Sequence, residues 1–483
     1  MVDFNSYVEP TKRKKILLLS DDFRLPSGVG CISKELVEGT AQHFNWVQIG
    51  AALTHPEAGK VVDMSAEINR VRGYSDASAK IYACSGYGDP MMLRNIMKIE
   101  KPDAIMMFTD PRYWIWLFQM EREIRQHIPI MYLNIWDDLP YPVYNRAFYQ
   151  ACDGLFAISK QTLNINKVVL GDEAKEHVIE YLPHGVNAAF RPLSDDDADL
   201  VRFKKTLYGD KDPEFALLYN ARNLGRKRTS DIILAWRGFL QKLEAEGKNC
   251  KNLRLVLHTD PVDNAGTDLP AVVKALIPEK YENTILFVAA KLSTADMNNL
   301  YNSSDGVILM SSNEGWGLSL TEALLTARMI IAPVTGGMQD QMKFVNDDGS
   351  WIDFSKTFPS NHTGLVKNHG CWAIPLPISN RACCGSPLTP YIYDDRCTIE
   401  EATQAIYELY ITPPKEREER GKIGEAWARS EEAGFTAEIM CNRFAEYVQK
   451  VFDNFKPRKR YDLTKVTEAP STYIDYDPVY YSR

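Results

Sequence analysis

The sequence lacks any apolar run close to the ~20 residues that a transmembrane helix needs. Its first residues, Met1-Val-Asp-Phe-Asn-Ser-Tyr7, also lack the apolar core of a signal peptide. A disulfide framework is not indicated, because the nine cysteines are an odd number without regular spacing. We therefore expect a protein of the cytoplasm, or of the host cytoplasm if the source is viral.

An excess of positive charge is absent as well. The net charge of −8 excludes a global attraction to nucleic acid or to anionic membranes. Basic residues gather only locally, at Lys12-Arg-Lys-Lys15, Arg226-Lys-Arg228 and Arg458-Lys-Arg460. The first and last of these runs keep a local contact with DNA open as an alternative.

The chain is too long for one hydrophobic core. It has 483 residues, whereas single cores stop growing near ~250–300 residues, so we expect two domains. The hydrophobic content of 45% and the charged content of 25% are ordinary for a globular enzyme.

Short, continuously apolar runs predict buried parallel strands, which are covered on both faces. In the first half they are residues 15–20, 46–50, 104–108, 128–134, 154–159 and 178–182, with helix-like segments such as 91–99 and 114–124 between them. The alternation restarts at 215–220, 253–258, 285–289, 306–310 and 329–333. This pattern favours an α/β fold of two doubly wound, Rossmann-like domains that face each other across a cleft.

A turn-rich, charged segment around residues 183–197 separates the two series of strands. We predict a first domain at 1–195 and a second domain at 196–430. Residues 345–397 show no strand–helix rhythm and are expected to form an irregular insert that contains cysteines. Residues 431–483 are expected to form a carboxyl-terminal helix and tail.

The stretch Ser311-Ser-Asn-Glu-Gly-Trp-Gly-Leu-Ser-Leu-Thr-Glu322 carries the strongest functional signal. It follows a predicted buried strand at 306–310 and leads into an apolar helical segment at 323–328. The carboxyl end of a strand, followed by the amino end of a helix, is the usual place for a phosphate or sugar ligand in an open α/β sheet. Glu314 and Glu322 are therefore predicted to face one cleft, although a helix-surface role is a fair alternative for Glu322.

The loop Pro26-Ser-Gly-Val-Gly30 follows the first predicted strand. Gly28 and Gly30 would let the backbone approach a ligand closely, and a plain connecting turn explains them equally well. The loop is not a dinucleotide fingerprint, because Ser33 stands where the third glycine or alanine belongs.

Together the motifs resemble those of the retaining GT-B glycosyltransferases of the glycogen-synthase-like (group 1) type. The matching segments, in the family's order, are Pro26–Gly30, Pro183-His-Gly-Val-Asn187, Arg222 with Lys227, Glu314 with Glu322, and Thr335-Gly-Gly337. The resemblance implies the GT-B fold, with the carboxyl-terminal helix crossing back onto the first domain. It also implies hexosyl or pentosyl transfer with retention at the anomeric carbon.

The resemblance assigns a nucleotide-sugar donor site. Glu314 would meet hydroxyls of the transferred sugar and Glu322 would accept hydrogen bonds from the ribose, because a carboxylate accepts several such bonds. The motif between them, Gly315-Trp-Gly317, belongs to the same site. A UDP-sugar is the favoured donor, with a GDP-sugar as the alternative.

The diphosphate of that donor needs positive charge as the glycosidic bond breaks. Arg222 offers a planar fork and Lys227 a compact charge, and the backbone amides of Leu318 and Ser319 would complete the cradle. Arg222, Lys227 and Glu314 are the residues assigned to catalysis. The resemblance also implies that the leaving phosphate helps to deprotonate the acceptor, so no protein nucleophile is assigned. No metal or other cofactor is expected, because Arg222, Lys227 and the helix amides supply the positive charge.

One departure from the family concerns the first domain. The family often carries a histidine-bearing loop near the sugar, whereas the corresponding segment here, Asn134-Ile-Trp-Asp-Asp138, has no histidine. Asp137 or Asp138 therefore becomes the candidate for a first-domain contact with the sugar or the acceptor.

Four cysteines of the irregular segment raise a metal site as an alternative. Sulfur ligands suit zinc, but the spacing of Cys371, Cys383, Cys384 and Cys397 matches no standard pair-and-pair arrangement.

We thus predict a glycosyltransferase that moves a sugar from a nucleoside diphosphate sugar to a hydroxyl acceptor. The acceptor is a glycan or, alternatively, a hydroxymethylated base of the kind found in phage DNA. A nucleotide-sugar epimerase or phosphorylase of the same fold and a non-catalytic sugar-binding protein are the rival functions.

Overall fold

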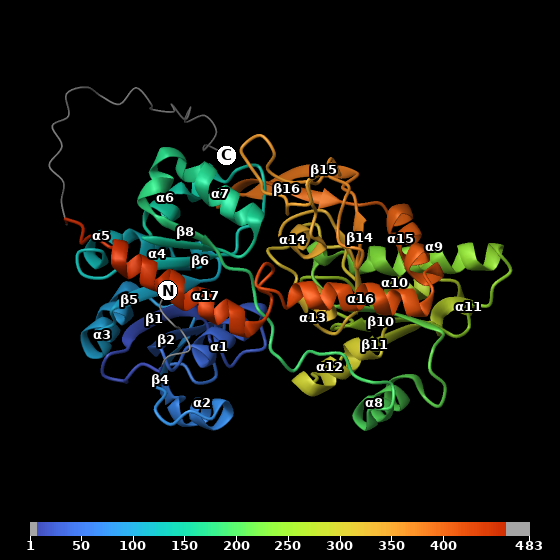
Figure 1. Cartoon of the computed structure of the whole chain (residues 1–483), viewed down its shortest axis with the longest axis horizontal. Coiled ribbons are helices and arrows are strands. Elements are labelled where there is room, and N and C mark those ends of the chain that lie inside the picture. Colours follow the sequence, from blue (N-terminus) through green and yellow to red (C-terminus); the bar gives the residue numbers. More distant parts are fainter. Residues whose placement is uncertain (1–6, 460–483) are drawn as a thin grey trace.

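Buried strands form two separate sheets in the computed structural model, which describes residues 7–459 (Figure 1). The first sheet has the order β3-β4-β2-β1-β5-β6-β7-β8 and is parallel except for the β3–β4 pair. Its strands are β1 (Lys14–Asp21), β2 (Phe44–Ala52), β3 (Val61–Asp63), β4 (Ala79–Ser85), β5 (Ala104–Phe108), β6 (Ile130–Asn134), β7 (Gly154–Ala157) and β8 (Val178–Tyr181).

Helices cover both faces of this sheet. They are α1 (Gly28–Gly39), α2 (Ser65–Arg72), α3 (Pro90–Glu100), α4 (Ile115–Gln119), α5 (Glu121–Ile124), α6 (Arg146–Gln150) and α7 (Lys160–Leu170). Ile16 and Leu18 of β1 belong to one hydrophobic cluster, whereas Leu17 and Leu19 belong to another. Burial on both faces explains why the strand is apolar at every position.

The second sheet is entirely parallel and has the order β11-β10-β9-β12-β13-β14. Its strands are β9 (Phe215–Asn220), β10 (Leu253–His258), β11 (Ile285–Val288), β12 (Gly306–Ile308), β13 (Met329–Pro333) and β14 (Ala373–Leu376). The helices of this half are α8 (Ala198–Tyr208), α9 (Thr229–Ala245), α10 (Leu269–Leu276), α11 (Glu279–Glu282), α12 (Thr294–Asn302), α13 (Leu318–Leu325), α14 (Met338–Met342), α15 (Ile399–Ile411) and α16 (Pro414–Ala428). The predicted α/β class with two Rossmann-like units is confirmed.

The predicted strands differ from the observed ones where apolarity is interrupted. β5, β9, β10 and β13 have the predicted ends, but β3 and β4 were not predicted. β3 has three residues and is mostly exposed, and β4 contains Lys80 within its apolar run. The helix expected at 114–124 is broken into a short 3₁₀ helix (Pro111–Trp114) followed by α4 and α5.

The segment expected to be irregular, 345–397, contains ordered strands. β14 joins the second sheet, and β15 (Asn380–Ser386) pairs with β16 (Thr389–Arg396) as an antiparallel hairpin. The hairpin reaches the first half of the chain, because the Tyr393 amide donates to the Leu139 carbonyl at 2.6 Å and the Tyr144 hydroxyl donates to the Tyr391 carbonyl at 2.8 Å. It therefore joins the two halves on one side of the molecule.

The last described helix, α17 (Ala437–Asn454), lies against the first half of the chain (Figure 1). It packs on α1, where Gly39 makes room for Cys441, and on β2, where Trp46 and Phe444 stack with ring centroids 5.9 Å apart. The predicted domain limits at 195 and 430 remain predictions. The predicted tail at 460–483 and the end of the basic run at Arg460 lie outside the described residues. Within residues 7–459, no helix is both long and apolar enough to cross a bilayer.

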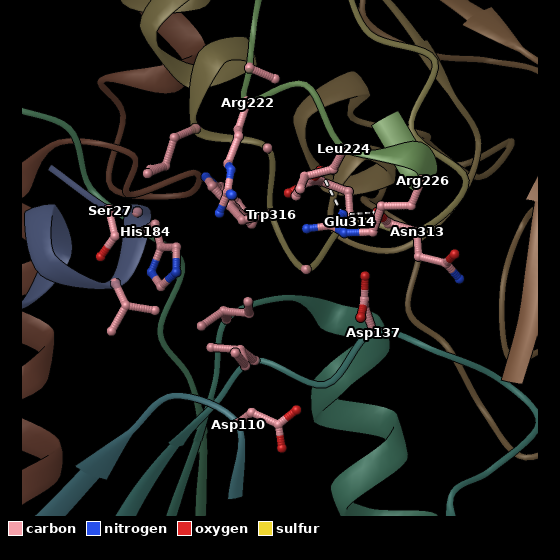
Figure 2. A pocket seen from close by; sticks show the side chains of 18 of the residues that line it. Ser27, Asp110, Asp137, His184, Arg222, Leu224, Arg226, Asn313, Glu314 and Trp316 are labelled. Atoms are coloured by element: carbon pink, nitrogen blue, oxygen red, sulfur yellow. Dashed lines mark hydrogen bonds and ion pairs between the residues drawn. The ribbon is translucent and has the colours of Figure 1, made fainter. Parts of the chain in front are cut away.

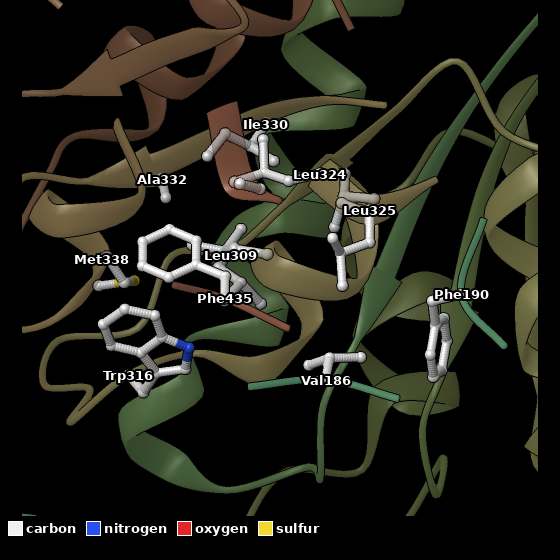
Figure 3. Packing of buried hydrophobic residues seen from close by; sticks show 14 of the residues in the cluster. Val186, Phe190, Leu309, Trp316, Leu324, Leu325, Ile330, Ala332, Met338 and Phe435 are labelled. Atoms are coloured by element: carbon white, nitrogen blue, oxygen red, sulfur yellow. The ribbon is translucent and has the colours of Figure 1, made fainter. Parts of the chain in front are cut away.

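The chain passes between its two halves at two segments that lie side by side, around residues 183–190 and 430–436. The Val186 amide donates to the Phe435 carbonyl, and the Ala437 amide donates to the Val186 carbonyl, both at 3.0 Å. Val186, Phe190 and Phe435 also extend the hydrophobic core between the halves (Figure 3).

A substitution at Gly185 measures how much the contact between these two segments contributes to stability. A Cβ at this position would overlap the carbonyl group of Thr436. The neighbour is backbone and cannot move aside alone, so Gly185→Ala is expected to lower the free energy of unfolding by about 1–3 kcal/mol. Thermal or denaturant unfolding measures this, and an unchanged midpoint would mean that the two segments separate without cost.

Candidate active site

A cavity of about 890 Å³ lies between the two halves of the molecule. The second half lines it with these predicted residues: Arg222, Lys227, Glu314, Gly315, Trp316, Gly317, Leu318, Ser319 and Glu322. The first half contributes Gly28, Asp137 and Asp138. The fold thus brings nearly all of the predicted residues, which span almost three hundred positions, to one cleft.

The two glycines of the loop Pro26–Gly30 have different surroundings. Gly28 faces the start of α13, because an added Cβ would lie 3.6 Å from Leu318 Cδ1. Gly30 does not line the cavity: its amide donates to Ser27 Oγ at 2.9 Å, and a Cβ would overlap the Leu25 carbonyl oxygen. Gly30 thus meets a packing requirement in the first turn of α1, and its predicted contact with the donor stays a prediction.

The turn that carries Glu314 is held by the loop after β13. The Gly337 amide donates to the Glu314 carbonyl at 3.1 Å, and side chains at Gly336 or Gly337 would overlap the backbone of this turn. The matching segment Thr335–Gly337 thus owes its glycines to this close approach. Gly317, with φ of +86°, then turns the chain into α13.

The amino end of α13 faces the cleft without a side-chain cap. Its first two amides belong to Leu318 and Ser319, and no acceptor for them is present among residues 7–459. Unsatisfied amides at a helix amino terminus attract anions through their N–H groups and the helix dipole. The position suits a phosphate group.

Glu314 forms a buried ion pair with Lys227. The Lys227 ammonium contacts Glu314 Oε2, and Arg226 Nη1 lies 3.3 Å from the same oxygen (Figure 2). Burial opposes ionisation of Glu314, but the charges of Lys227 and Arg226 outweigh it and hold its pKa at about 2. Burial also lowers the pKa of Lys227, an effect that Glu314 opposes.

Glu322 has neutral partners instead. The Tyr301 hydroxyl donates to Glu322 Oε2 at 2.5 Å, and Asn220 Nδ2 donates to the same oxygen at 3.3 Å. Burial raises the pKa of Glu322 to about 7, because these two hydrogen bonds only partly offset the loss of water. Oε1 has no partner among the described residues and is free to accept from a ligand.

Arg222 is more exposed than Lys227, the other cation predicted to bind the diphosphate. Its side chain is 67% exposed, whereas that of Lys227 is 10% exposed. Arg222 Nε donates to Asp263 Oδ2 at 2.9 Å. This contact holds the guanidinium at the rim of the cleft (Figure 2).

Trp316 contributes packing beneath the cleft. It is 2% exposed, its Nε1 donates to Thr321 Oγ1 at 2.9 Å, and its ring meets Phe435 edge-on at 4.9 Å (Figure 3). Its indole therefore forms the floor on which the donor-binding turn rests.

The first half supplies an acidic wall. Asp138 accepts from Asn313 of the opposite half, and burial raises its pKa well above the usual range. Asp137 points into the cleft toward Glu314 (Figure 2), and burial raises its pKa to about 6.

Several residues of the cleft were not predicted. Arg226 lies next to a predicted residue within the run 226–228, and its adjacency to Lys227 was the available signal. His184 stands inside the matched motif 183–187; it is buried, and its pKa is lowered to about 3 by burial. Asp110 and Arg112 pair at 2.5 Å on the first-half wall and follow a predicted strand end at residue 108.

The alternative zinc site is not formed. No group of three or more His, Cys, Asp or Glu side chains within residues 7–459 is arranged to hold a metal ion. Cys383 and Cys384 are neighbours on β15, so their side chains point to opposite faces of the hairpin.

Comparisons with known proteins agree with this architecture. No family model and no curated protein matches the chain. Among solved structures, HepE of Anabaena in complex with UDP and glucose superposes with a TM-score of 0.62 at 12% identity, covering 91% of this chain and 100% of that one. Sucrose-phosphate synthase of Thermosynechococcus elongatus gives 0.61 at 14% identity, with 91% and 100% covered.

A third match extends the comparison to a plant enzyme. The catalytic domain of starch synthase IV of Arabidopsis thaliana, bound to ADP and acarbose, gives a TM-score of 0.57 at 11% identity, covering 91% of this chain and 99% of that one. Identities this low establish shared architecture. The chain therefore has the GT-B fold of these two-domain glycosyltransferases.

Proposed function

We propose that the protein transfers a sugar from a nucleoside diphosphate sugar, UDP-linked by preference or GDP-linked, to a hydroxyl acceptor with retention at the anomeric carbon. The observation that carries the proposal is the convergence of Arg222, Arg226, Lys227 and the open amino end of α13 on one cavity beside two glutamates. Such a set of donors fits a diphosphate, and the glutamates fit hydroxyl groups.

The chemistry follows from the charges. As the bond between sugar and diphosphate breaks, negative charge grows on the leaving phosphate, and cations fixed nearby stabilise it more than they stabilise the intact donor. Glu314 holds Lys227 in place and has a second oxygen for sugar hydroxyls. The acceptor oxygen forms its bond to the anomeric carbon as the diphosphate leaves, and the leaving phosphate accepts the proton of the acceptor hydroxyl. Because Arg222, Lys227 and the amides of α13 supply the positive charge, the transfer requires no metal.

A ligand screen tests the proposal. UDP-, GDP-, ADP- and TDP-sugars are compared by thermal stabilisation, and the bound donor is then incubated with glycans and with hydroxymethylated DNA for mass spectrometry. Transfer to either acceptor class supports the proposal and chooses between them. Sugar conversion without an acceptor would indicate an epimerase, and stabilisation without turnover would indicate a binding protein.

Arg222 offers a test that separates binding from folding. Its pair with Asp263 is exposed, and such pairs contribute about 0–1 kcal/mol, so Arg222→Ala should leave the unfolding temperature unchanged. Donor turnover should fall by roughly 10- to 100-fold, because a phosphate contact is lost. Arg202→Ala is the matched control, since it breaks another exposed ion pair of the same half, with Asp199. Equal turnover in both variants would contradict the phosphate role of Arg222.

A further inference from the structure

Asp137 differs from every other carboxylate of the cleft in having no partner. Glu314 pairs with Lys227, Glu322 accepts from Tyr301, Asp138 accepts from Asn313, and Asp110 pairs with Arg112. Among residues 7–459, no other residue forms a hydrogen bond or an ion pair with the Asp137 carboxylate, although the charges of Arg226 and Lys227 act on it from a distance. A carboxylate that lines the cavity without a protein donor is available to accept hydrogen bonds from a ligand.

The backbone of Asp137 is held in place beside the cleft. Gln161 Nε2 donates to the Asp137 carbonyl at 2.5 Å. Gln161 is itself buried and accepts from Gln339 Nε2 at 3.0 Å. Residues of both halves therefore hold the backbone of Asp137 at the cleft.

Asp137 faces the Glu314 end of the cavity. A Cβ on Gly336 would touch both the Glu314 carbonyl oxygen and, at 3.5 Å, the Cβ of Asp137. The two backbones thus approach each other across one glycine, and Figure 2 shows the Asp137 carboxylate directed toward Glu314 and Arg226. At the other end of the site, Glu322 accepts hydrogen bonds from Tyr301 and Asn220 of the second half.

We propose that Asp137 is the first-half wall of the sugar pocket, and that Asp137 and Glu314 together restrict the transferred sugar to a neutral one. The inference rests on the proposed function. The two carboxylates accept from hydroxyls on either side of the sugar ring, so the pocket is complete only when both halves of the chain are in contact.

The selection against acidic sugars follows from charge. Burial raises the pKa of Asp137 to about 6, which leaves it mostly ionised at neutral pH. The nearby cations, Arg226 and Lys227, are the groups that a diphosphate would engage. A sugar carboxylate, as in a uronic acid, would then face two carboxylates, and the nearby cations Arg226 and Lys227 are already paired with Glu314.

Titration calorimetry of UDP, UDP-glucose and UDP-glucuronate, repeated with GDP and GDP-mannose, tests this inference. Wild-type protein should bind UDP-glucuronate at least roughly tenfold more weakly than UDP-glucose. In Asp137→Asn, the affinity for UDP should be unchanged. UDP-glucose should bind roughly tenfold more weakly than to wild type, as expected for a lost hydrogen bond to a charged group. The difference in affinity between UDP-glucose and UDP-glucuronate should become smaller. Asp172→Asn is the matched control, since it removes an exposed carboxylate of the first half.

The outcomes separate the two proposals. If neither UDP nor GDP binds wild-type protein, the proposed function is wrong, and this inference falls with it. If a nucleotide binds but Asp137→Asn discriminates between the neutral and acidic sugars as wild type does, only the role of Asp137 is wrong. A thermal melt of each variant confirms that the fold is intact.

Discussion

Replacing Lys227 with methionine should abolish nearly all donor turnover and also destabilise the protein. The ammonium is the buried cation of the proposed phosphate site, so the loss of turnover should reach roughly 100- to 1000-fold. Its removal leaves Glu314 as a buried carboxylate whose remaining cation, Arg226, lies 3.3 Å away. Breaking a buried pair in this way costs about 3 kcal/mol.

The double variant Lys227→Met/Glu314→Gln separates the two effects. With the unpaired charge removed, stability should return to near the wild-type value, whereas turnover should stay low. The wild-type pair also predicts a pH dependence. The pKa of Glu314 is depressed from 4.5 to about 2, so its contribution to stability is present above pH 4.5 and is lost as the pH falls toward 2.

Unfolding curves and steady-state donor hydrolysis measure both quantities. Normal turnover in Lys227→Met would show that Lys227 does not bind the phosphate. A variant with normal stability would instead show that the ion pair with Glu314 contributes nothing to the fold.

Replacing Glu322 with glutamine should weaken nucleotide binding and yet stabilise the unliganded protein at alkaline pH. Burial raises the pKa of Glu322 from 4.5 to about 7, so the folded state loses stability as the pH rises between these two values. Glu322→Gln removes this penalty, which is on the order of 2 kcal/mol above pH 7. Its unfolding temperature should therefore exceed that of wild type at pH 8 and equal it near pH 4.5.

Nucleotide affinity should respond in the opposite direction. An ionised Glu322 accepts hydrogen bonds from two ribose hydroxyls, whereas glutamine offers one oxygen, so the loss should be roughly 10- to 100-fold. Wild-type affinity should fall between pH 8 and pH 6 as Glu322 takes up its proton, and the variant should not show this dependence. A pH-independent affinity in wild type would contradict the ribose role.

The fold and the two glutamates of the cleft could be predicted because both are marked by patterns of neighbouring residues in the sequence. Buried parallel strands are apolar throughout, and a strand that turns into a helix marks a ligand site wherever it occurs in such sheets. Gly336 and Gly337 are required because side chains there would overlap the backbone of the turn at Glu314, whereas a Cβ on Gly315 would meet Ile135 of the first half.

Contacts between distant segments were not predictable in this way. The hairpin β15–β16 lies more than two hundred positions after Tyr144, which it contacts. Its strand β15 is largely exposed, β16 is mostly half-buried, and neither contains an apolar run. The partners of Glu322, Tyr301 and Asn220, come from two other elements and carry no motif. Gly30 meets a packing requirement that the sequence did not reveal, because a glycine required by packing looks the same in a sequence as one required by a ligand.

The coupling of the two halves gives the site its structure. The second half supplies the charges for a diphosphate, and the first half supplies Asp137, Asp138 and the loop at Gly28. The two crossing segments and the hairpin hold these walls together on opposite sides of the cleft. A change in the crossing at Gly185 is therefore expected to alter sugar binding more than nucleotide binding.

Calorimetric titration of UDP and GDP into the wild-type protein and into Lys227→Met/Glu314→Gln tests the central claim most directly. Saturable binding of one nucleotide at one site per chain, lost in the double variant, is the predicted result. Equal binding by both proteins, or no binding of either nucleotide to the wild type, would contradict a nucleotide-sugar site in this cleft.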